Sequence, residues 1–272
     1  MANYSVLYTG GNNSTLNFNN SNILFGNVGI GGNGKFAGAG GCTPSPCIIN
    51  GGIDFAAAEQ TPSQFKDSGD DIRGGVHYSV ADVATALANL SSLTTTLAND
   101  AGNSLTINAG KGQKQVIKAS AGKQQGTSGI YVFDVTSLHF GNGATLSIQN
   151  DTGNPNASVV FDVASSVNPQ FGGAITLTGF SMDQVLFNIE GGTTLQINTN
   201  GEVENADFLD YGGPISINHS VLQGRLLGGD SVNMQIVSGA EIVPEPAYSG
   251  CLLLGMVVTA GLVHRKRRAH IS

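Results

Sequence analysis

The residues with the most obvious capacity for chemistry are the acids of the sequence KDSGDD. Asp67, Asp70 and Asp71 stand close together, and a pair of carboxylic acids on an extracellular β protein can cleave glycosidic bonds. A solvated loop leading into a helix has the same composition. No GxSxG nucleophile motif is present in the sequence. We therefore expect no catalytic residue, and we keep an extracellular carbohydrate-active enzyme as the second alternative.

A phosphate-binding glycine motif is present without the element that it needs. Gly29, Gly31 and Gly34 have the GxGxxG spacing after the strand-like residues NILF. A dinucleotide site requires a helix at this point, whose N-terminal amides meet the pyrophosphate. The chain continues as KFAGAGGCTPSPC, which is too rich in Gly and Pro to begin a helix. We expect no nucleotide and no other cofactor.

The histidines, cysteines and remaining acids predict no metal site. None of the five His residues has an HExxH or comparable spacing. Cys42 and Cys47 flank the sequence TPSP and can close a small disulfide loop in an oxidising compartment, with two free thiols as the alternative. Asp134 and Asp162 each stand in an FDV sequence, which suggests equivalent positions in two coils. They can point outward, cap turns or bind a cation together.

The composition is that of an extracellular β protein with many turns. Only 11% of the 272 residues are charged, and 39 are Gly. Four of the twelve basic residues lie after His264, so 8 basic and 19 acidic residues precede Ala247, a net charge of −11. Such an acidic region has no basic stripe with which to neutralise phosphates. The composition therefore excludes nucleic acid as a partner.

Short segments with alternating polar and apolar residues recur along the chain. Each places two apolar side chains on one face of a strand and polar ones on the other. These segments are TLNFN (15–19), SLTIN (104–108), TLSIQ (145–149), TLQIN (194–198) and PISIN (214–218). Further β-branched and aromatic stretches lie between them. The spacing fits coils of roughly 20 residues with insertions, which predicts a β-solenoid.

One segment, residues 79–100, departs from the β pattern. Val83, Leu87, Leu90, Leu93 and Leu97 recur at spacings of three and four, which predicts an amphipathic helix. Ser79 and Asp82 resemble a capping box at its start, and Gly102 follows as a stop signal. We expect this helix to lie along the solenoid and to cover an apolar flank.

Hydroxyl residues predict a polar ladder on the solenoid surface. Thr176 and Thr178 form a TxT unit, and Thr145 with Ser147 approximates it. Regular threonine arrays can order water and bind ice. The outward positions also include Asn17, Gln196 and Ser216, so ordinary solvated strands with cross-strand hydrogen bonds are the alternative.

The end of the chain has the character of a sorting signal. Residues 247–263 carry no charge, a length at the short end for a transmembrane helix. A basic stop follows and favours a cytoplasmic C-terminus; it consists of Arg265, Lys266, Arg267 and Arg268. Together with the preceding motif, this tail resembles the PEP-CTERM sorting signal of bacterial surface proteins; the motif is Val243, Pro244, Glu245 and Pro246. The resemblance implies transfer across the inner membrane and removal of the tail by an exosortase, a transient partner.

The body resembles the choice-of-anchor A and ice-binding-like β-solenoid group. The resemblance rests on the long helix and on GNVGIGG, INGGIDF, GIYVFDV, the residues from LSIQ to VVFDV, and the residues from VLFNI to GAEI. The group includes adhesin-like and ice-binding proteins. Its members normally begin with a secretory signal peptide, whereas MANYSVLYTGG enters the first strand at once. We expect the natural start to lie upstream or the chain to be truncated.

These observations combine into one prediction. The fold is mainly β: a right-handed β-solenoid (β-helix) over residues 1–242 with one long flanking α-helix, followed by the sorting signal and C-terminal transmembrane helix of residues 243–272. The protein is an exported, non-enzymatic surface or matrix protein with a structural or adhesive role, and its further partners are the membrane and exopolysaccharide or another surface. It passes through the inner membrane to the cell surface or extracellular matrix. An ice-binding protein that uses one face of the solenoid is the alternative.

Overall fold

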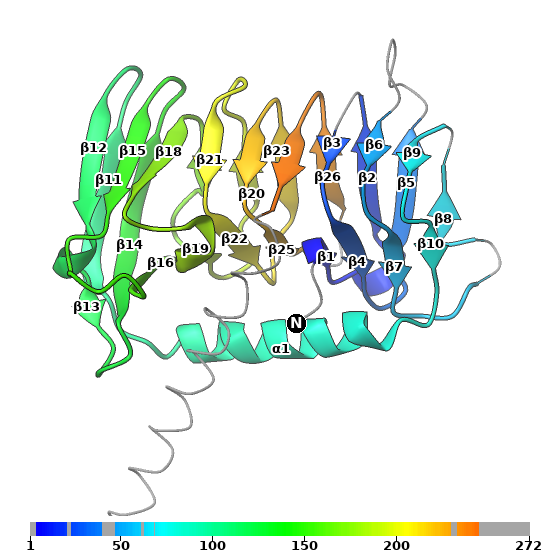
Figure 1. Cartoon of the computed structure of the whole chain (residues 1–272), viewed down its shortest axis with the longest axis horizontal. Coiled ribbons are helices and arrows are strands. Elements are labelled where there is room, and N and C mark those ends of the chain that lie inside the picture. Colours follow the sequence, from blue (N-terminus) through cyan, green and yellow to red (C-terminus); the bar gives the residue numbers. More distant parts are fainter. Residues whose placement is uncertain are drawn as a thin grey trace, which may run out of the picture.

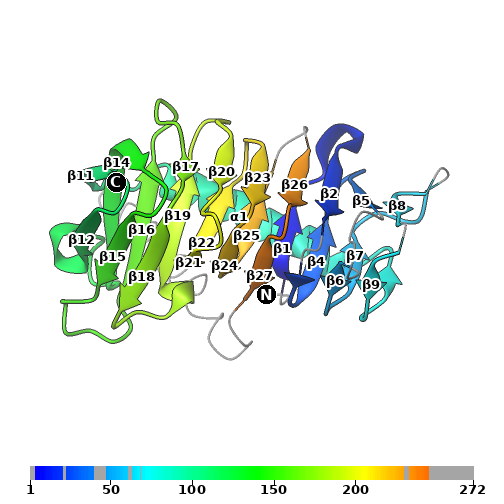
Figure 2. The same ribbon diagram turned by 90° about the horizontal axis from the view of Figure 1, so that it is seen from above.

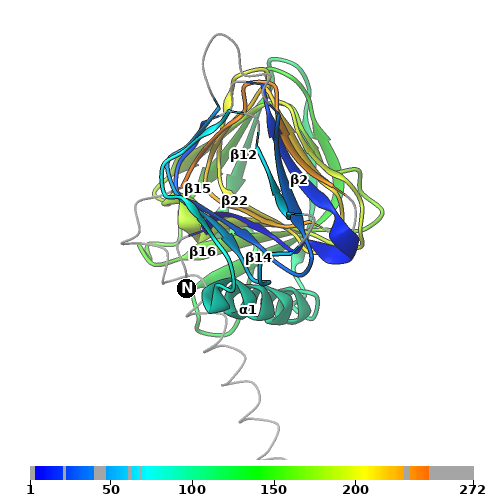
Figure 3. The same cartoon turned by 90° about the vertical axis from the view of Figure 1, so that its right-hand side faces the viewer.

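The chain folds into a parallel β-solenoid of triangular cross-section with one long α-helix along one side (Figure 3). The computed structural model describes residues 4–20, 23–39, 47–60, 63–67, 69–229 and 233–244. Three rows of strands make the three faces, which we call the helix-covered face, the amide face and the nine-stranded face. Parallel pairing between successive coils connects the strands of each face.

The helix-covered face is one ladder of the larger, 18-stranded sheet. Its strands are β1 (Tyr4–Tyr8), β4 (Asn27–Ile30), β7 (Ile53–Phe55), β10 (Val76–His77), the first half of β14 (Ile130–Phe140), β16 (Ser158–Val163), β19 (Val185–Ile189), β22 (Asp207–Asp210) and β25 (Leu226–Gly228). The short strand β13 (Lys123–Gln124) pairs antiparallel with β14 and forms the sole antiparallel pair among the described strands.

The amide face is the second ladder of the same sheet, joined to the first through the long strand β14. Its other strands are β2 (Thr15–Asn19), β5 (Lys35–Ala39), β8 (Phe65–Lys66), β11 (Asn103–Ala109), β17 (Gln170–Phe171), β20 (Leu195–Ile197), β23 (Ile215–Asn218) and β26 (Met234–Val237).

The nine-stranded face is a separate, wholly parallel sheet. Its strands, in spatial order, are β12 (Lys114–Lys118), β15 (Thr145–Gln149), β18 (Ala174–Thr178), β21 (Val203–Asn205), β24 (Val221–Gln223), β27 (Glu241–Val243), β3 (Ile23–Leu24), β6 (Ile48–Ile49) and β9 (Asp71–Ile72). Three short 3₁₀ turns lie outside the sheets: η1 (Gly11–Asn13), η2 (Ala119–Ala121) and η3 (Met182–Gln184).

The chain starts in the middle of the solenoid, builds outward to one end, and then returns from the other end to the middle. Strands β1 to β10 build the coils at one end, and helix α1 (Ala81–Leu97) then runs along the body to the other end (Figure 1). The coils from β11 onward return towards the start. They meet the first coils in the middle, where β25 pairs with β1, β26 with β2 and β27 with β3 (Figure 2). We call this junction the seam.

The core fills the solenoid with one inward side chain at every second strand position, as the alternating segments predict. Phe133, Phe161, Phe187 and Phe208 stack in successive coils with ring centroids 5.4, 4.6 and 5.3 Å apart. The two FDV sequences occupy equivalent positions, since Phe133 pairs with Phe161 and Asp134 with Asp162. Both apolar residues of TLNFN, TLSIQ, TLQIN and PISIN are buried, so the solenoid prediction is confirmed for these strands.

Helix α1 covers the apolar flank, as its leucine stripe predicts. Val83, Ala86, Leu90, Leu93 and Leu97 are buried in a second cluster. Their partners in this cluster come from strands of the helix-covered face and include Leu7, Val160, Leu186, Leu209 and Leu227. Leu87, expected in the stripe, is only half-buried.

The predicted capping box is wrong. Val80 is the N-cap residue and no side chain caps the helix. Ser79 and Val80 instead donate their backbone N–H groups to the carbonyl oxygens of Ala57 and Phe55. Contacts with the neighbouring coil therefore set the start of the helix.

The GxGxxG motif lies in a strand and the turn after it, and a strand follows rather than a helix. Gly29 belongs to β4, and β5 begins directly after Gly34. These glycines allow two coils to approach closely: a Cβ on Gly31 would lie 2.7 Å from the carbonyl oxygen of Thr9, and a Cβ on Gly34 would lie 2.6 Å from the Cα of Gly10. The motif serves coil packing.

The predicted fold class needs a correction. The fold is mainly β with parallel sheets and a single α-helix, and no helix among the described residues is long and apolar enough to cross a membrane. The segment that we expected to form the transmembrane helix, residues 247–263, lies outside the described residues. The prediction of a transmembrane helix is therefore withdrawn, and with it the support for the membrane as a partner and for passage through the inner membrane.

Candidate functional site

The nine-stranded face presents two outward rows of side chains. Neighbouring strands stand about 4.8 Å apart, and the strand registers align their residues without a bulge. The first row is Lys114, Thr145, Ala174, Val203, Val221, Glu241, Ile23, Ile48 and Asp71. The second is Val116, Ser147, Thr176, Asn205, Gln223, Val243, Phe25, Asn50 and Arg73.

These rows combine aliphatic groups, hydroxyls, amides and few charges. Between the end strands β12 and β9, Glu241 is the one charged side chain in the two described rows. The only large hydrophobic side chains that are exposed within the described residues, Phe25 (37%) and Val116 (47%), both lie here. The TxT prediction is confirmed in part, because Thr176 and Thr178 are exposed on this face, next to Ser147 and Gln149 of β15.

The amide face presents a different row. Its outward residues are Asn108, His139, Gln170, Gln196, Ser216, Gln235, Asn17, Ala37 and Lys66. Asn17, Gln196 and Ser216, which the sequence pattern groups with the outward threonines, thus belong to a separate amide-rich row. The five alternating segments are distributed over two faces, so one mixed array becomes two distinct surfaces.

The predicted acid cluster forms a turn at one end of the solenoid. Asp67 accepts the backbone N–H groups of Gly69 and Asp70 at 3.1 and 3.0 Å. Burial, followed by the charge of Asp67, raises the pKa of Asp70 to about 7. Asp71 pairs with Arg73 at 2.9 Å on the exposed surface. The carboxylates thus support the turn, and the arrangement offers no feature specific to a glycosidase.

The row of Asp134 and Asp162 continues to Asn188 on the helix-covered face. Asn188 donates to Asp162 at 2.8 Å, and Asp134 accepts the backbone N–H of Gly102. Burial raises the pKa of Asp162 to about 8, and the nearby Glu190 adds to the effect. Within the part of the chain that the structure describes, no group of three or more His, Cys, Asp or Glu side chains is placed to hold a metal ion.

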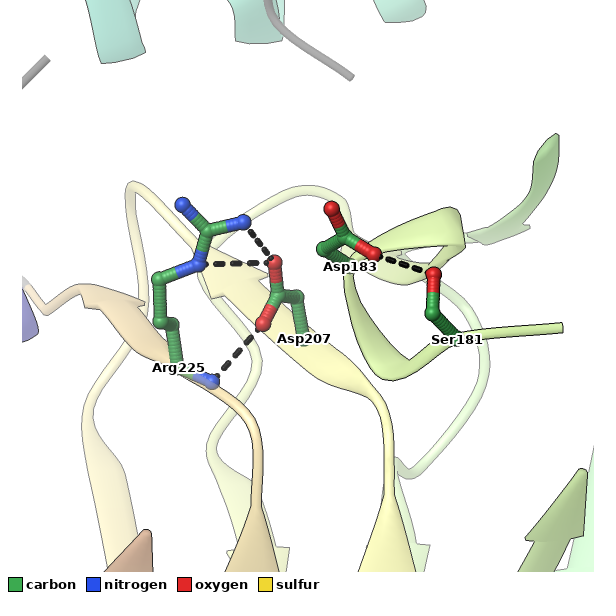
Figure 4. Close-up of polar contacts among 4 residues, drawn as sticks. All are labelled: Ser181, Asp183, Asp207 and Arg225. Atoms are coloured by element: carbon green, nitrogen blue, oxygen red, sulfur yellow. Dashed lines mark hydrogen bonds and ion pairs between the residues drawn. The ribbon is translucent and has the colours of Figure 1, made fainter. Parts of the chain in front are cut away.

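Asp207 and Glu204 are buried acids that the sequence analysis did not single out. Arg225 forms an ion pair with Asp207, in which its Nη2 and Nε both donate to Oδ2, at 2.6 and 3.0 Å (Figure 4). Arg225 also donates its backbone N–H to the same carboxylate, and Ser181 donates to the nearby Asp183. The Asp207–Arg225 pair links β22 to the residue before β25 and has a structural role.

Glu204 lies inside the solenoid, at an inward position of β21 between Ile175 and Leu222. Neither of its carboxylate oxygens has a hydrogen-bond partner among the described residues, and burial raises its pKa well above the ordinary value. Burial thus favours the neutral form of this carboxyl group.

Most residues of the predicted disulfide and sorting motif lie outside the described residues. Cys47 is buried and disulfide-bonded, whereas Cys42 and Cys251 are not described, so the Cys42–Cys47 pair stays a prediction. Val243 ends strand β27 and Pro244 follows it. Glu245, Pro246 and the basic stop, Arg265, Lys266, Arg267 and Arg268, lie outside the described residues. The PEP-CTERM signal and the exosortase therefore stay predictions.

Residues 1–206 match the sequence profile of a family described as an "Ice-binding-like adhesive domain". The chain belongs to this family. Among curated proteins, none matches the chain.

The fold is similar to that of solved ice-binding proteins. One is from the Antarctic ascomycete Antarctomyces psychrotrophicus, with a TM-score of 0.50, 15% identity, and coverage of 86% of this chain and 96% of that one. Another is from an Antarctic bacterium of the Flavobacteriaceae, with a TM-score of 0.54, 18% identity, and coverage of 91% and 46%. At these low identities the structural similarity establishes a common fold. The family description and the names of the two solved proteins denote ice-binding or adhesive proteins rather than enzymes.

Proposed function

We propose that this protein binds ice through the nine-stranded face. The observation that carries the proposal is the pair of outward rows on this face, which align aliphatic, hydroxyl and amide side chains in register over nine strands, with one charged residue between the two end strands. The membership of an ice-binding-like family supports it. The role is non-enzymatic, and the sequence-level alternative of ice binding replaces adhesion as the primary function.

Side-chain stiffness favours the nine-stranded face over the amide face. Val and Thr have one or two preferred χ1 rotamers, so their methyl and hydroxyl groups have nearly fixed positions before any ligand arrives. The three Gln side chains of the amide row lose up to about 2 kcal/mol of rotamer entropy each when they are immobilised. Water held at a spacing of about 4.8 Å over the stiff rows is therefore already partly ordered.

The test is an assay of ice-recrystallisation inhibition with the full chain and two matched variants. Thr176→Tyr adds a bulky ring to the middle of the nine-stranded face, whereas Gln196→Tyr adds the same ring to the amide face; both positions are exposed. We expect inhibition by the wild type at micromolar concentration, its loss in Thr176→Tyr, and its retention in Gln196→Tyr. Absence of inhibition by the wild type would refute ice binding, and the reverse pattern would assign it to the other face.

The amide row favours a second function, adhesion to a neutral hydroxylated polymer such as a polysaccharide. Asn and Gln both donate and accept hydrogen bonds, which suits hydroxyl groups, and the row carries no formal charge between Asn108 and Ala37. Binding of neutral polysaccharides by the wild type, lost in Gln170→Ala/Gln196→Ala and kept in Thr176→Tyr, would support it. Equal binding by both variants would exclude the amide row as the contact.

An extracellular or cell-surface location fits both functions. The buried, disulfide-bonded Cys47 supports an oxidising compartment, where disulfides persist. Proteolysis of intact cells provides the test. Loss of the solenoid after external protease treatment supports a surface location, whereas full protection places the protein inside the cell.

A further inference from the structure

The two ends of the solenoid carry opposite charge. The coil of residues 101–129, which we call the lysine end, contains four lysines and no acid in its sequence. All four are exposed: Lys111, Lys114, Lys118 and Lys123. The coil of residues 56–78, the acidic end, contains four acids and two basic residues. Half of the eight basic residues before Ala247 thus lie on one terminal coil of an otherwise acidic body.

Both ends also present unpaired strand edges of the same sheets. At the lysine end, β12 pairs with β15 alone among the described strands. At the acidic end, β9 pairs with β6 alone within the same described set. Because every pair in the nine-stranded sheet is parallel, a second copy shifted along the solenoid axis would place its β9 beside β12 in the same direction. An unpaired edge of this kind accepts another strand.

The register places opposite charges at matching positions. Lys114 and Asp71 stand at the two ends of one outward row of the nine-stranded face. Lys111 lies in the corner between β11 and β12, and Asp67 and Asp70 lie in the equivalent corner between β8 and β9. Stacking in register would therefore bring Lys114 against Asp71 and Lys111 against the Asp67–Asp70 turn.

We propose that copies of this chain associate head to tail, with the lysine end of one copy on the acidic end of the next. Four lysines facing four lysines repel each other, so the charges disfavour lysine-end to lysine-end contact and select one direction. Such a heterologous contact does not close on itself and produces short filaments. Each added copy lengthens the nine-stranded face by the same rows of side chains.

Charge reversal across two copies tests this contact, using the full chain in sedimentation velocity at several protein and salt concentrations. We expect reversible association of the wild type that weakens with salt. Lys114→Glu and Asp71→Lys, tested separately, should each weaken association about fivefold, because each replaces an attraction between exposed charges by a repulsion. An equimolar mixture of the two variants should regain near wild-type association, because the reversed charges then face each other.

Lys123→Glu is the matched control. It reverses a charge at the same end, but Lys123 lies on β13, away from the Lys114 row, so it should change association less than Lys114→Glu does. Lys114 and Lys123 are exposed and Asp71 is partly exposed. Circular dichroism will verify that the variants fold. Any of three results would overturn the proposal: a wild type that is monomeric at every concentration, association that Lys114→Glu leaves unchanged, or an equimolar mixture of the two variants that stays dissociated. So would a monomer whose lysine end binds an anionic polysaccharide instead.

Discussion

The helix-covered face and the nine-stranded face both carry aliphatic side chains on their outward rows, yet only one of them is covered. On the helix-covered face, Leu209, Leu227 and Leu7 stand side by side and pack under α1. On the nine-stranded face, Val203 and Val221 are neighbours too, but the rows on either side of them contain Thr, Asn and Gln. A continuous leucine stripe needs a cover, whereas aliphatic groups interspersed with polar ones can face water. The difference identifies the open face as the surface available for a ligand.

The largest expected effect on stability concerns the mostly buried ion pair between Asp207 and Arg225. Arg225→Ala leaves the carboxylate of Asp207, whose side chain is 5% exposed, without its ion pair. We expect a loss of about 3–5 kcal/mol in the free energy of unfolding, measured by urea denaturation. Arg73→Ala breaks the exposed pair with Asp71 and should cost less than about 1 kcal/mol. Similar losses in both variants would mean that burial does not change how much an ion pair contributes to the free energy of unfolding.

Outward aliphatic residues on the two faces offer a direct comparison. Leu209→Ala removes a fully buried side chain beneath α1 and should cost about 2–5 kcal/mol. Val221→Ala, at a half-buried position of the open face, should cost less than about 1 kcal/mol. Thermal and urea unfolding measure both values. A large loss for Val221→Ala would show that the nine-stranded face is covered by something in solution.

Asp162 makes the helix-covered face sensitive to pH. Its pKa rises from 3.8 to about 8, mainly because it is buried. A carboxyl group with a raised pKa stabilises the fold fully below the unfolded pKa, and this contribution is lost as the pH rises from about 4 towards 8. Asp162→Asn should therefore be more stable than the wild type at pH 8, with a difference that shrinks towards pH 4.

Asp151 is the control for this pH dependence, because hydrogen bonds from Ser120 lower its pKa. Its contribution has the opposite sign: it is present above the unfolded pKa and is lost as the pH falls. Asp151→Asn should thus never be more stable than the wild type at pH 8. Unfolding curves at pH 4, 6 and 8 measure both variants, and a constant difference for Asp162→Asn would contradict the burial of its charge.

The smallest effect concerns the inner side of the nine-stranded face. Glu204→Leu replaces a buried carboxyl without hydrogen bonds by the residue type that occupies the same row in β15 and β24. We expect a gain of about 1–3 kcal/mol in stability near neutral pH. Glu241→Gln, an outward change on the same sheet, should stay within about 0.5 kcal/mol. Destabilisation by Glu204→Leu would reveal a polar partner inside the solenoid.

Local patterns in the sequence predicted the strands and the helix, because alternation and a leucine stripe depend on residues close together in the chain. They could not predict the seam, since no local signal in β1 or β25 encodes pairing over some 220 residues. For the same reason they missed Glu204, whose inward direction follows from its register with Ile175 and Leu222.

The candidate site was predicted only in its parts. Thr176 and Thr178 were expected to point outward, and they do. The division of the outward residues between two faces depends on how the corners of each coil turn the chain, which strand alternation does not encode. The acids of KDSGDD show the limit most plainly, because their types suggest catalysis whereas their positions make a turn.

The seam also has a consequence for how the protein is made. During synthesis, β1, β2 and β3 emerge first, but the strands that complete them, β25, β26 and β27, follow some 200 residues later. At ordinary translation rates the first coils wait about 10–40 s with one edge of each strand open. If the late strands of a neighbouring nascent chain arrive first, they fit that edge equally well. The product is a domain-swapped dimer. A low concentration of nascent chains and a low rate of initiation should therefore favour the monomeric fold.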